Sequence, residues 1–177
     1  FFFNLMISLC LTCDHRYVYM LKWWMELNFS RKRKSVNVMY TVLKDIQVRY
    51  GETDQMGVVY HANYIIWFEL GRTELINSLG LSYVEMEEKG IISPVIDVQA
   101  SYKKPVRYGD KVKVRTYVKK YDGIRVTYHY EVINGNDEVC VTGESVHICV
   151  RKESFRPIAI RKHLPEWHEA YEKVKVN

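Results

Sequence analysis

The sequence predicts an α+β domain in which a mostly antiparallel sheet curls around one long apolar helix. One helical pattern, at about residues 63–79, is apolar over much of its surface, so other structure must wrap it. Four long strand patterns follow, at about 95–104, 111–121, 124–134 and 138–151. Successive strands with segregated helices are typical of an antiparallel α+β architecture.

The 177 residues are enough for one domain with a substantial core, and few for two. Regular patterning begins only after residue 38. Residues 1–38 are therefore expected to be a leader outside the domain, interpreted as an upstream extension, with Met39 starting a domain over 39–177. A truncated membrane or secretory anchor and a disordered tail are the alternatives for the leader. Its apolar run is too short to span a bilayer, and we expect no membrane insertion of the domain.

The formal charge of +5 comes mainly from the leader. Residues 1–38 hold six basic and two acidic residues, whereas residues 39–177 hold twenty and nineteen. A nucleic-acid-binding domain concentrates basic residues on one face. The nearly neutral domain therefore predicts no nucleic-acid partner.

The first elements place a strand, a loop and the long helix in order. Residues 42–50 alternate apolar and polar, which predicts a half-buried strand with Ile46, Val48 and Tyr50 facing inward. Residues 51–62 form a loop, and Gly80 closes the helix at 63–79. The expected apolar face of this helix consists of Tyr64, Phe68, Gly71, Leu75 and Leu79, widened by Ile65, Trp67 and Ile76. Gly71 on this face predicts a close backbone approach.

The remaining elements follow from turn chemistry. A short helix is expected at about 82–89, where Gly90 stops it. Residues 134–137 (Asn-Gly-Asn-Asp) predict a hairpin turn, and residues 121–123 (Tyr-Asp-Gly) predict another, since Asn and Gly tolerate positive φ. Residues 164–174 resemble a terminal amphipathic helix.

The four cysteines do not form a disulfide framework. Cys10 and Cys13 make a lone CxxC without the second ligand pair of a zinc site. Cys140 and Cys149 are an odd number of positions apart in one strand pattern, so they are expected on opposite sides. Reduced cysteines predict a cytoplasmic protein, and no metal site is evident.

The loop before the long helix holds the residues that could carry chemistry. Asp54 and His61 precede the helix N-terminus, where free N–H groups and the helix dipole can stabilise an oxyanion. Gly57 allows a tight turn between them. From spacing alone, Asp54 is better explained as a turn residue, and His61 is explained equally well as a helix-start residue that hydrogen-bonds locally. Tyr60 and Asn63 are open to interpretation as packing and N-cap residues.

The residues around this loop carry a specific resemblance. The motif Arg-Tyr-x-Glu-Thr-Asp-x-x-Gly-Val-Val-Tyr-His-x-Asn-Tyr spans residues 49–64, and Trp67-Phe68-Glu69 and Arg72-Thr73-Glu74 follow it. A second segment, residues 101–110, contains Tyr-x-x-Pro-x-x-x-x-Asp. Over about residues 39–170 the chain resembles the 4-hydroxybenzoyl-CoA/YbgC-type thioesterases.

The resemblance implies a hotdog fold, an acyl-CoA thioester hydrolase and a homodimer or homotetramer whose active sites lie at the dimer interface. The family's catalytic acid corresponds to Asp54, and its helix-start N–H to about His61, the second candidate catalytic residue. Gly57, Val58, Tyr60 and Asn63 are the expected substrate-binding residues. No cofactor is implied, because CoA is part of the substrate.

The chemistry suits these residues. A thiolate leaves readily, so one carboxylate and an oxyanion donor suffice without a Ser-His-Asp triad. The sequence leaves open whether Asp54 attacks directly or activates water, and which acyl group is preferred. A non-catalytic acyl-thioester binding module is the main alternative, and the motif of a hotdog dehydratase is absent. Two basic groups near the strands are expected to be solvated strand ends rather than phosphate ligands: Lys103, Lys104 and Arg107, and Lys119 and Lys120.

Overall fold

The computed structural model describes residues 39–176, which belong to a compact unit formed by Met39–Asn177. The predictions for residues 1–38 lie outside the described part. Its elements in chain order are β1 (Val42–Gln47), the 3-10 helix η1 (Tyr50–Glu52), α3 (Asn63–Ser78), α4 (Tyr83–Glu88), β2 (Ile91–Ile92), β3 (Val95–Tyr102), β4 (Lys111–Tyr121), β5 (Arg125–Asn134), β6 (Val139–Ile148), β7 (Val150–Arg151), α5 (Ile160–His163) and α6 (Pro165–Val174).

Five strands form one antiparallel sheet in the order β1-β4-β5-β6-β3. The long strands β4, β5 and β6 alternate buried and partly exposed side chains, as expected for a sheet with one face on the core. β1 and β3 are the edges. The short strands β2 and β7 pair separately. β2 escaped prediction because two residues are too few for a periodic pattern, whereas the single strand predicted at 138–151 is divided into β6 and β7. The predicted α+β architecture is confirmed.

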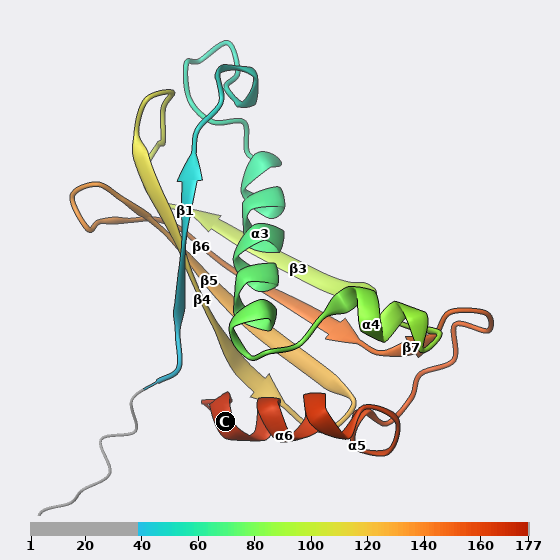
Figure 1. Cartoon of the computed structure of the whole chain (residues 1–177). Helices are drawn as coiled ribbons and strands as arrows, with labels where there is room; N and C mark the ends of the chain where they lie inside the picture. The colour runs from blue at the N-terminus through green and yellow to red at the C-terminus, as the bar shows by residue number, and fades with distance from the viewer. Residues whose placement is uncertain (1–38, 177) are drawn as a thin grey trace, which may run out of the picture. The chain divides into compact units, whose positions relative to one another are not determined.

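Helix α3 crosses one face of the sheet, as Figure 1 shows, and packs against β1, β4 and β5. Gly71 makes the close approach possible. A Cβ built on Gly71 would lie 2.4 Å from Thr116 Oγ1 and 2.8 Å from Val114 Cγ1, distances that real Cβ atoms do not reach. The predicted role of Gly71 is therefore confirmed, with β4 as the neighbour.

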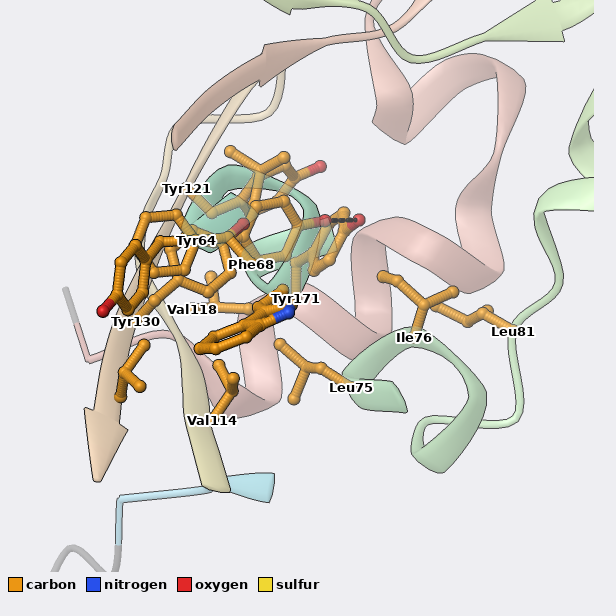
Figure 2. Packing of buried hydrophobic residues seen from close by; sticks show 14 of the residues in the cluster. Tyr64, Phe68, Leu75, Ile76, Leu81, Val114, Val118, Tyr121, Tyr130 and Tyr171 are labelled. Carbon is orange, nitrogen blue, oxygen red and sulfur yellow. Dashed lines mark hydrogen bonds between the residues drawn. The ribbon is translucent and has the colours of Figure 1, made fainter. Parts of the chain in front are cut away.

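The core lies between α3, α6 and the sheet (Figure 2). The Phe68 ring stacks on Tyr130 of β5, with the centroids 4.6 Å apart and the planes 8° from parallel. Leu75 and Ile76 are 0% exposed, and burying each such side chain stabilises the fold by about 1.5–3 kcal/mol. The Tyr171 hydroxyl of α6 lies 2.6 Å from that of Tyr128, so two buried phenols satisfy each other.

Two residues that were predicted to face inward are exposed. The strand pattern at 42–50 ends at Gln47, and the chain turns into η1, which leaves Tyr50 77% exposed. Ile65 is 36% exposed on α3, beside Ile66 and Leu70 at 49% and 40%. The sheet covers only part of the circumference of α3, so its apolar surface extends beyond the covered face.

The predicted turns and helix ends are confirmed. Gly80 and Gly90 end α3 and α4 with φ of +72° and +70°, values that glycine adopts without strain. Asp122 Oδ1 accepts hydrogen bonds from the Ile124 and Arg125 N–H groups at 2.9 and 2.7 Å, which fixes the β4–β5 turn. The C-terminal helix is α6, and the single turn α5 precedes it.

Cys140 and Cys149 are both buried and free. Within residues 39–176, none of the helices has the length and apolar character needed to cross a membrane.

Candidate active site

The loop between η1 and α3 folds back on itself as a small hairpin. Thr53 and Val59 form an isolated antiparallel bridge, and the Asp54 N–H donates to the Val58 carbonyl at 2.9 Å. Gly57 has φ of +72°, and its N–H donates to the Asp54 carbonyl at 2.9 Å. The positive φ explains the glycine. The predicted tight turn at Gly57 is confirmed.

The Asp54 side chain has two different oxygens in this turn. Oδ1 accepts a hydrogen bond from the Met56 N–H at 2.9 Å, an Asx-type contact that fixes the carboxylate relative to its own backbone. Oδ2 has no hydrogen-bond partner among residues 39–176. The turn interpretation and the chemical interpretation of Asp54 are therefore compatible, because the turn uses one oxygen and leaves the other for a ligand.

The start of α3 presents unpaired N–H groups. Ala62 is the N-cap and makes no side-chain cap, while the Asn63 N–H donates to the Tyr60 carbonyl at 2.9 Å. Within the described chain, the N–H groups of His61, Ala62 and Tyr64 have no hydrogen-bond acceptor. Unpaired N–H groups at a helix start favour anionic ligands. The start of α3 is therefore a candidate oxyanion site.

Asn63 is not the N-cap that its residue type suggested. It is the first residue of α3, and its Nδ2 donates to the Glu52 carbonyl at 2.7 Å. That bond turns the amide back toward the loop. Val58 is also engaged through its backbone, since its carbonyl accepts the Asp54 N–H. Both predicted substrate-binding residues therefore help to shape the loop.

Aromatic side chains surround His61. Its ring lies 4.2 Å from the Tyr60 ring and 6.5 Å from the Tyr102 ring, centroid to centroid. The Tyr102 hydroxyl of β3 donates to the His61 carbonyl at 3.1 Å, so the loop contacts the edge strand. Tyr64 packs edge-on against Tyr102 at 5.5 Å. Burial raises the pKa of Tyr64 to about 12, so this phenol is neutral at pH 7.

A residue without an assigned role in the sequence is central to the loop. Glu52 is only 7% exposed, and its carboxylate accepts hydrogen bonds from Arg49 and from the Trp67 indole of α3. A glutamate in a loop is ordinarily exposed. Its position within the Gly-Glu-Thr-Asp run was the only available signal, and that run does not reveal burial.

Two of the five basic residues near the strands form ion pairs. Lys104 pairs with Glu138 at 2.5 Å, and Lys119 pairs with Glu144. For these two lysines, the structure agrees with the interpretation as solvated strand ends. Among the described residues, no cluster of three or more His, Cys, Asp or Glu side chains could hold a metal ion.

Comparison with known proteins identifies the family. The family model of the thioesterase-like superfamily matches residues 48–168, which include the Asp54 loop and four strands of the large sheet, β3 to β6. The chain belongs to this superfamily. The resemblance read from the motif is confirmed, together with the expectation of a thioesterase.

Individual relatives of this superfamily member agree. It is 53% identical over 137 residues to the putative acyl-CoA thioesterase YneP of Bacillus subtilis, covering 77% of this chain and 99% of that protein. It is 25% identical over 119 residues to the acyl-CoA thioester hydrolase YbgC of Escherichia coli O6:H1, covering 67% and 89%. The crystal structure of the DHNA-CoA thioesterase of Staphylococcus aureus matches with a TM-score of 0.74 and 48% identity over 76% of this chain and 90% of that chain. The hotdog fold is thereby confirmed.

Proposed function

We propose that the protein hydrolyses acyl-CoA thioesters to a free acid and CoA, with Asp54 as the reacting carboxylate. Two observations carry this proposal: Asp54 Oδ2 has no partner among the described residues, and the same loop ends at unpaired N–H groups at the start of α3. Relatives named as acyl-CoA thioesterases, one of them 53% identical, support the substrate class.

In this mechanism the thioester carbonyl oxygen lies at the helix start, where the N–H groups of His61, Ala62 and Tyr64 stabilise the developing oxyanion. Asp54 either removes a proton from water as the water oxygen attacks the carbonyl carbon, or attacks that carbon itself to give a mixed anhydride that water hydrolyses. In both routes the carbon–sulfur bond breaks, and its electron pair leaves on the CoA sulfur. The thiolate needs little protonation, because thiols have a pKa near 8.5.

His61 has a secondary role in this proposal. Its backbone N–H serves the oxyanion, whereas its exposed ring lies tilted against Tyr60 and edge-on to Tyr102 and helps to orient the substrate. An imidazole can also donate or accept a proton during the reaction. Gly57 and Val58 hold the loop, and Tyr60 and Asn63 border the space between the loop and α3.

The aromatic surroundings favour an aromatic acyl group. Tyr60, His61 and Tyr102 gather at the loop and the edge strand, and offset or edge-on contacts between rings add about 0.5–1.5 kcal/mol to apolar burial. The Staphylococcus aureus relative, 48% identical, is named for a CoA thioester of an aromatic acid. An acyl panel that contrasts aromatic with straight-chain thioesters tests this preference.

The working enzyme in this proposal is a homodimer or larger homo-oligomer, built on the β3 edge. Val95, Ile96, Val98 and Tyr102 of this strand are 51%, 50%, 42% and 51% exposed. An exposed apolar edge strand tends to pair with another strand. Since Tyr102 also touches His61, a second copy at this edge would border the site. Free Cys140 and Cys149 are consistent with a cytoplasmic location.

The decisive experiment measures thiol release from a panel of acyl-CoA substrates by wild type, Asp54→Asn and Asp122→Asn. Asp122 is a matched control, because it also caps its own turn through Oδ1, but in the β4–β5 hairpin. We expect kcat to fall by about a thousandfold for Asp54→Asn, with a smaller change in KM, and to be unchanged for Asp122→Asn. Near-wild-type hydrolysis by Asp54→Asn would remove Asp54 from the mechanism. Binding of acyl-CoA without turnover by wild type would favour the non-catalytic binding module.

A further inference from the structure

Glu52 connects the three segments that frame the Asp54 loop. Its carboxylate accepts the Arg49 backbone N–H at 2.8 Å and the Arg49 guanidinium at 3.1 Å, both before the loop. The same carboxylate accepts the Trp67 Nε1–H of α3 at 3.3 Å. The Glu52 carbonyl accepts the Tyr60 N–H at 2.9 Å and Asn63 Nδ2 at 2.7 Å, both after the loop. Five hydrogen bonds therefore converge on one residue.

These bonds fix both ends of the loop to the helix. Between them, the Thr53–Val59 bridge and the Asp54–Val58 hydrogen bond make the hairpin a unit of its own. Glu52 contacts the chain on both sides of this hairpin, through its carboxylate toward Arg49 and through its carbonyl toward Tyr60 and Asn63.

We propose that Glu52 is a positioning residue that holds Asp54 in register with the oxyanion site at the start of α3. The inference rests on the proposed function, since it assigns Glu52 a task only if Asp54 reacts. Displacement of a reacting group by about 1 Å can lower the rate about a hundredfold, so a clamp on this loop acts on kcat.

The position requires a carboxylate rather than an amide. All three groups that the carboxylate contacts are donors: the Arg49 N–H on Oε2, and the Arg49 guanidinium and Trp67 indole on Oε1. A carboxylate accepts on both oxygens, whereas glutamine has one acceptor oxygen and one NH₂ donor. In Glu52→Gln, the NH₂ group of the amide must therefore face one of these N–H donors. Glutamine has almost the same shape, so the substitution changes hydrogen bonding and charge with little change in packing.

The experiment compares kcat and KM for thiol release by wild type, Glu52→Gln and Glu131→Gln. Glu131 is the matched control, because it is partly buried and pairs with Arg115 at 2.8 Å on the sheet, away from the loop. We expect kcat of Glu52→Gln to fall by about 10- to 100-fold with KM changed by less than about threefold. Glu131→Gln should keep wild-type kcat. The rates are compared well below the unfolding temperature of each variant and normalised to folded protein.

Two double variants separate positioning from a general loss of stability. In the Asp54→Asn background, Glu52→Gln should cause no further loss of the residual kcat, because the carboxylate that it positions is already gone. Adding Trp67→Phe to Glu52→Gln removes the indole donor and leaves space for the glutamine NH₂ beside an aromatic ring. This second change should recover part of kcat although it removes a buried hydrogen bond. A purely structural role predicts the opposite, a further loss in both double variants.

Several results would overturn the inference: wild-type kcat for Glu52→Gln, a loss that tracks the unfolded fraction, or full additivity with Asp54→Asn. Failure of the proposed function would give different results. In that case wild type does not turn over acyl-CoA, or Asp54→Asn retains its rate. If wild type is active, Asp54→Asn is inactive and Glu52→Gln keeps the wild-type rate, only the positioning role of Glu52 is refuted.

Discussion

A buried histidine makes the stability of this protein depend on pH. His147 of β6 is 0% exposed, and its Nε2 lies 2.9 Å from both Arg72 Nη1 and Ser145 Oγ. Arginine stays protonated and can only donate, so Nε2 must accept and the imidazole must be neutral. The other ring nitrogen faces the Ser93 carbonyl at 3.5 Å. The neighbouring Tyr128 and Tyr130 are neutral phenols. None of these contacts of His147 is a carboxylate, which would favour the protonated imidazole.

The magnitude follows from the pKa. Burial, and then the charge of Arg72, lowers the pKa of His147 from 6.5 to about 4. In the unfolded chain this histidine takes up a proton below about pH 6.5, whereas in the folded protein it does so only near pH 4. The group's contribution to stability is therefore complete above pH 6.5 and is lost as the pH falls toward 4. The full loss is about 3 kcal/mol, of which about 2 kcal/mol is lost by pH 5.

Urea unfolding of wild type and His147→Gln at about pH 7.5 and pH 5 measures this contribution. Glutamine offers Arg72 an acceptor oxygen but does not titrate in this range. We expect wild type to lose about 2 kcal/mol more than the variant between the two pH values, which corresponds to a midpoint shift of about 1 M urea. Other titrating groups are common to both proteins and cancel in the comparison. Equal losses in the two proteins would refute the assignment of a neutral, low-pKa His147.

Two further predictions concern Gly143 and His61. Gly143→Ala would place a Cβ 2.3 Å from Phe68 Cε2 and 2.9 Å from the Gln99 carbonyl oxygen. This substitution should lower the free energy of unfolding by about 2–3 kcal/mol. Gly135→Ala should leave that free energy unchanged, because its Cβ would meet nothing nearer than 3.8 Å. Thermal unfolding of both variants checks this, and an unchanged Gly143→Ala would contradict the close packing. His61→Ala should lower kcat by no more than about tenfold, because the backbone N–H at the helix start remains. Thiol-release kinetics decide, and a loss equal to that of Asp54→Asn would mean that the imidazole is essential.

The sequence predicted the elements whose signal is local. The α3 boundaries followed from helical spacing and Gly80, and both hairpin turns followed from Asn, Asp and Gly. Tyr50 was misplaced because the alternating pattern runs past Gln47, where the chain turns into η1. Ile65 was misplaced because the periodicity of a sequence shows how wide the apolar face of a helix is. It does not show how much of that face the rest of the same chain buries. Exposed apolar residues therefore remain on α3 and β3 of the single chain.

The candidate site was predictable where the motif is contiguous. Asp54, Gly57 and His61 lie within eight positions of one another in the sequence, and the structure places all three in the loop that precedes α3. Glu52 and Trp67 are 15 positions apart, and Arg72 and His147 are 75 apart. Which charged residues become buried depends on such long-range contacts, and neither spacing nor composition encodes them directly.

Two buried polar clusters contact α3 at different points along its length. Glu52 bonds to Trp67 in the first part of the helix, beside the Asp54 loop, whereas Arg72 lies further along and contacts His147 of β6. Between them, Phe68 stacks on Tyr130 and Gly71 lies against β4, which holds the helix firmly to the sheet. A change at His147 should therefore alter the pH dependence of unfolding and leave kcat above pH 6.5 unaffected. A change at Glu52 should lower kcat while leaving that pH dependence intact, because the helix that carries both clusters stays fixed by the packing between them.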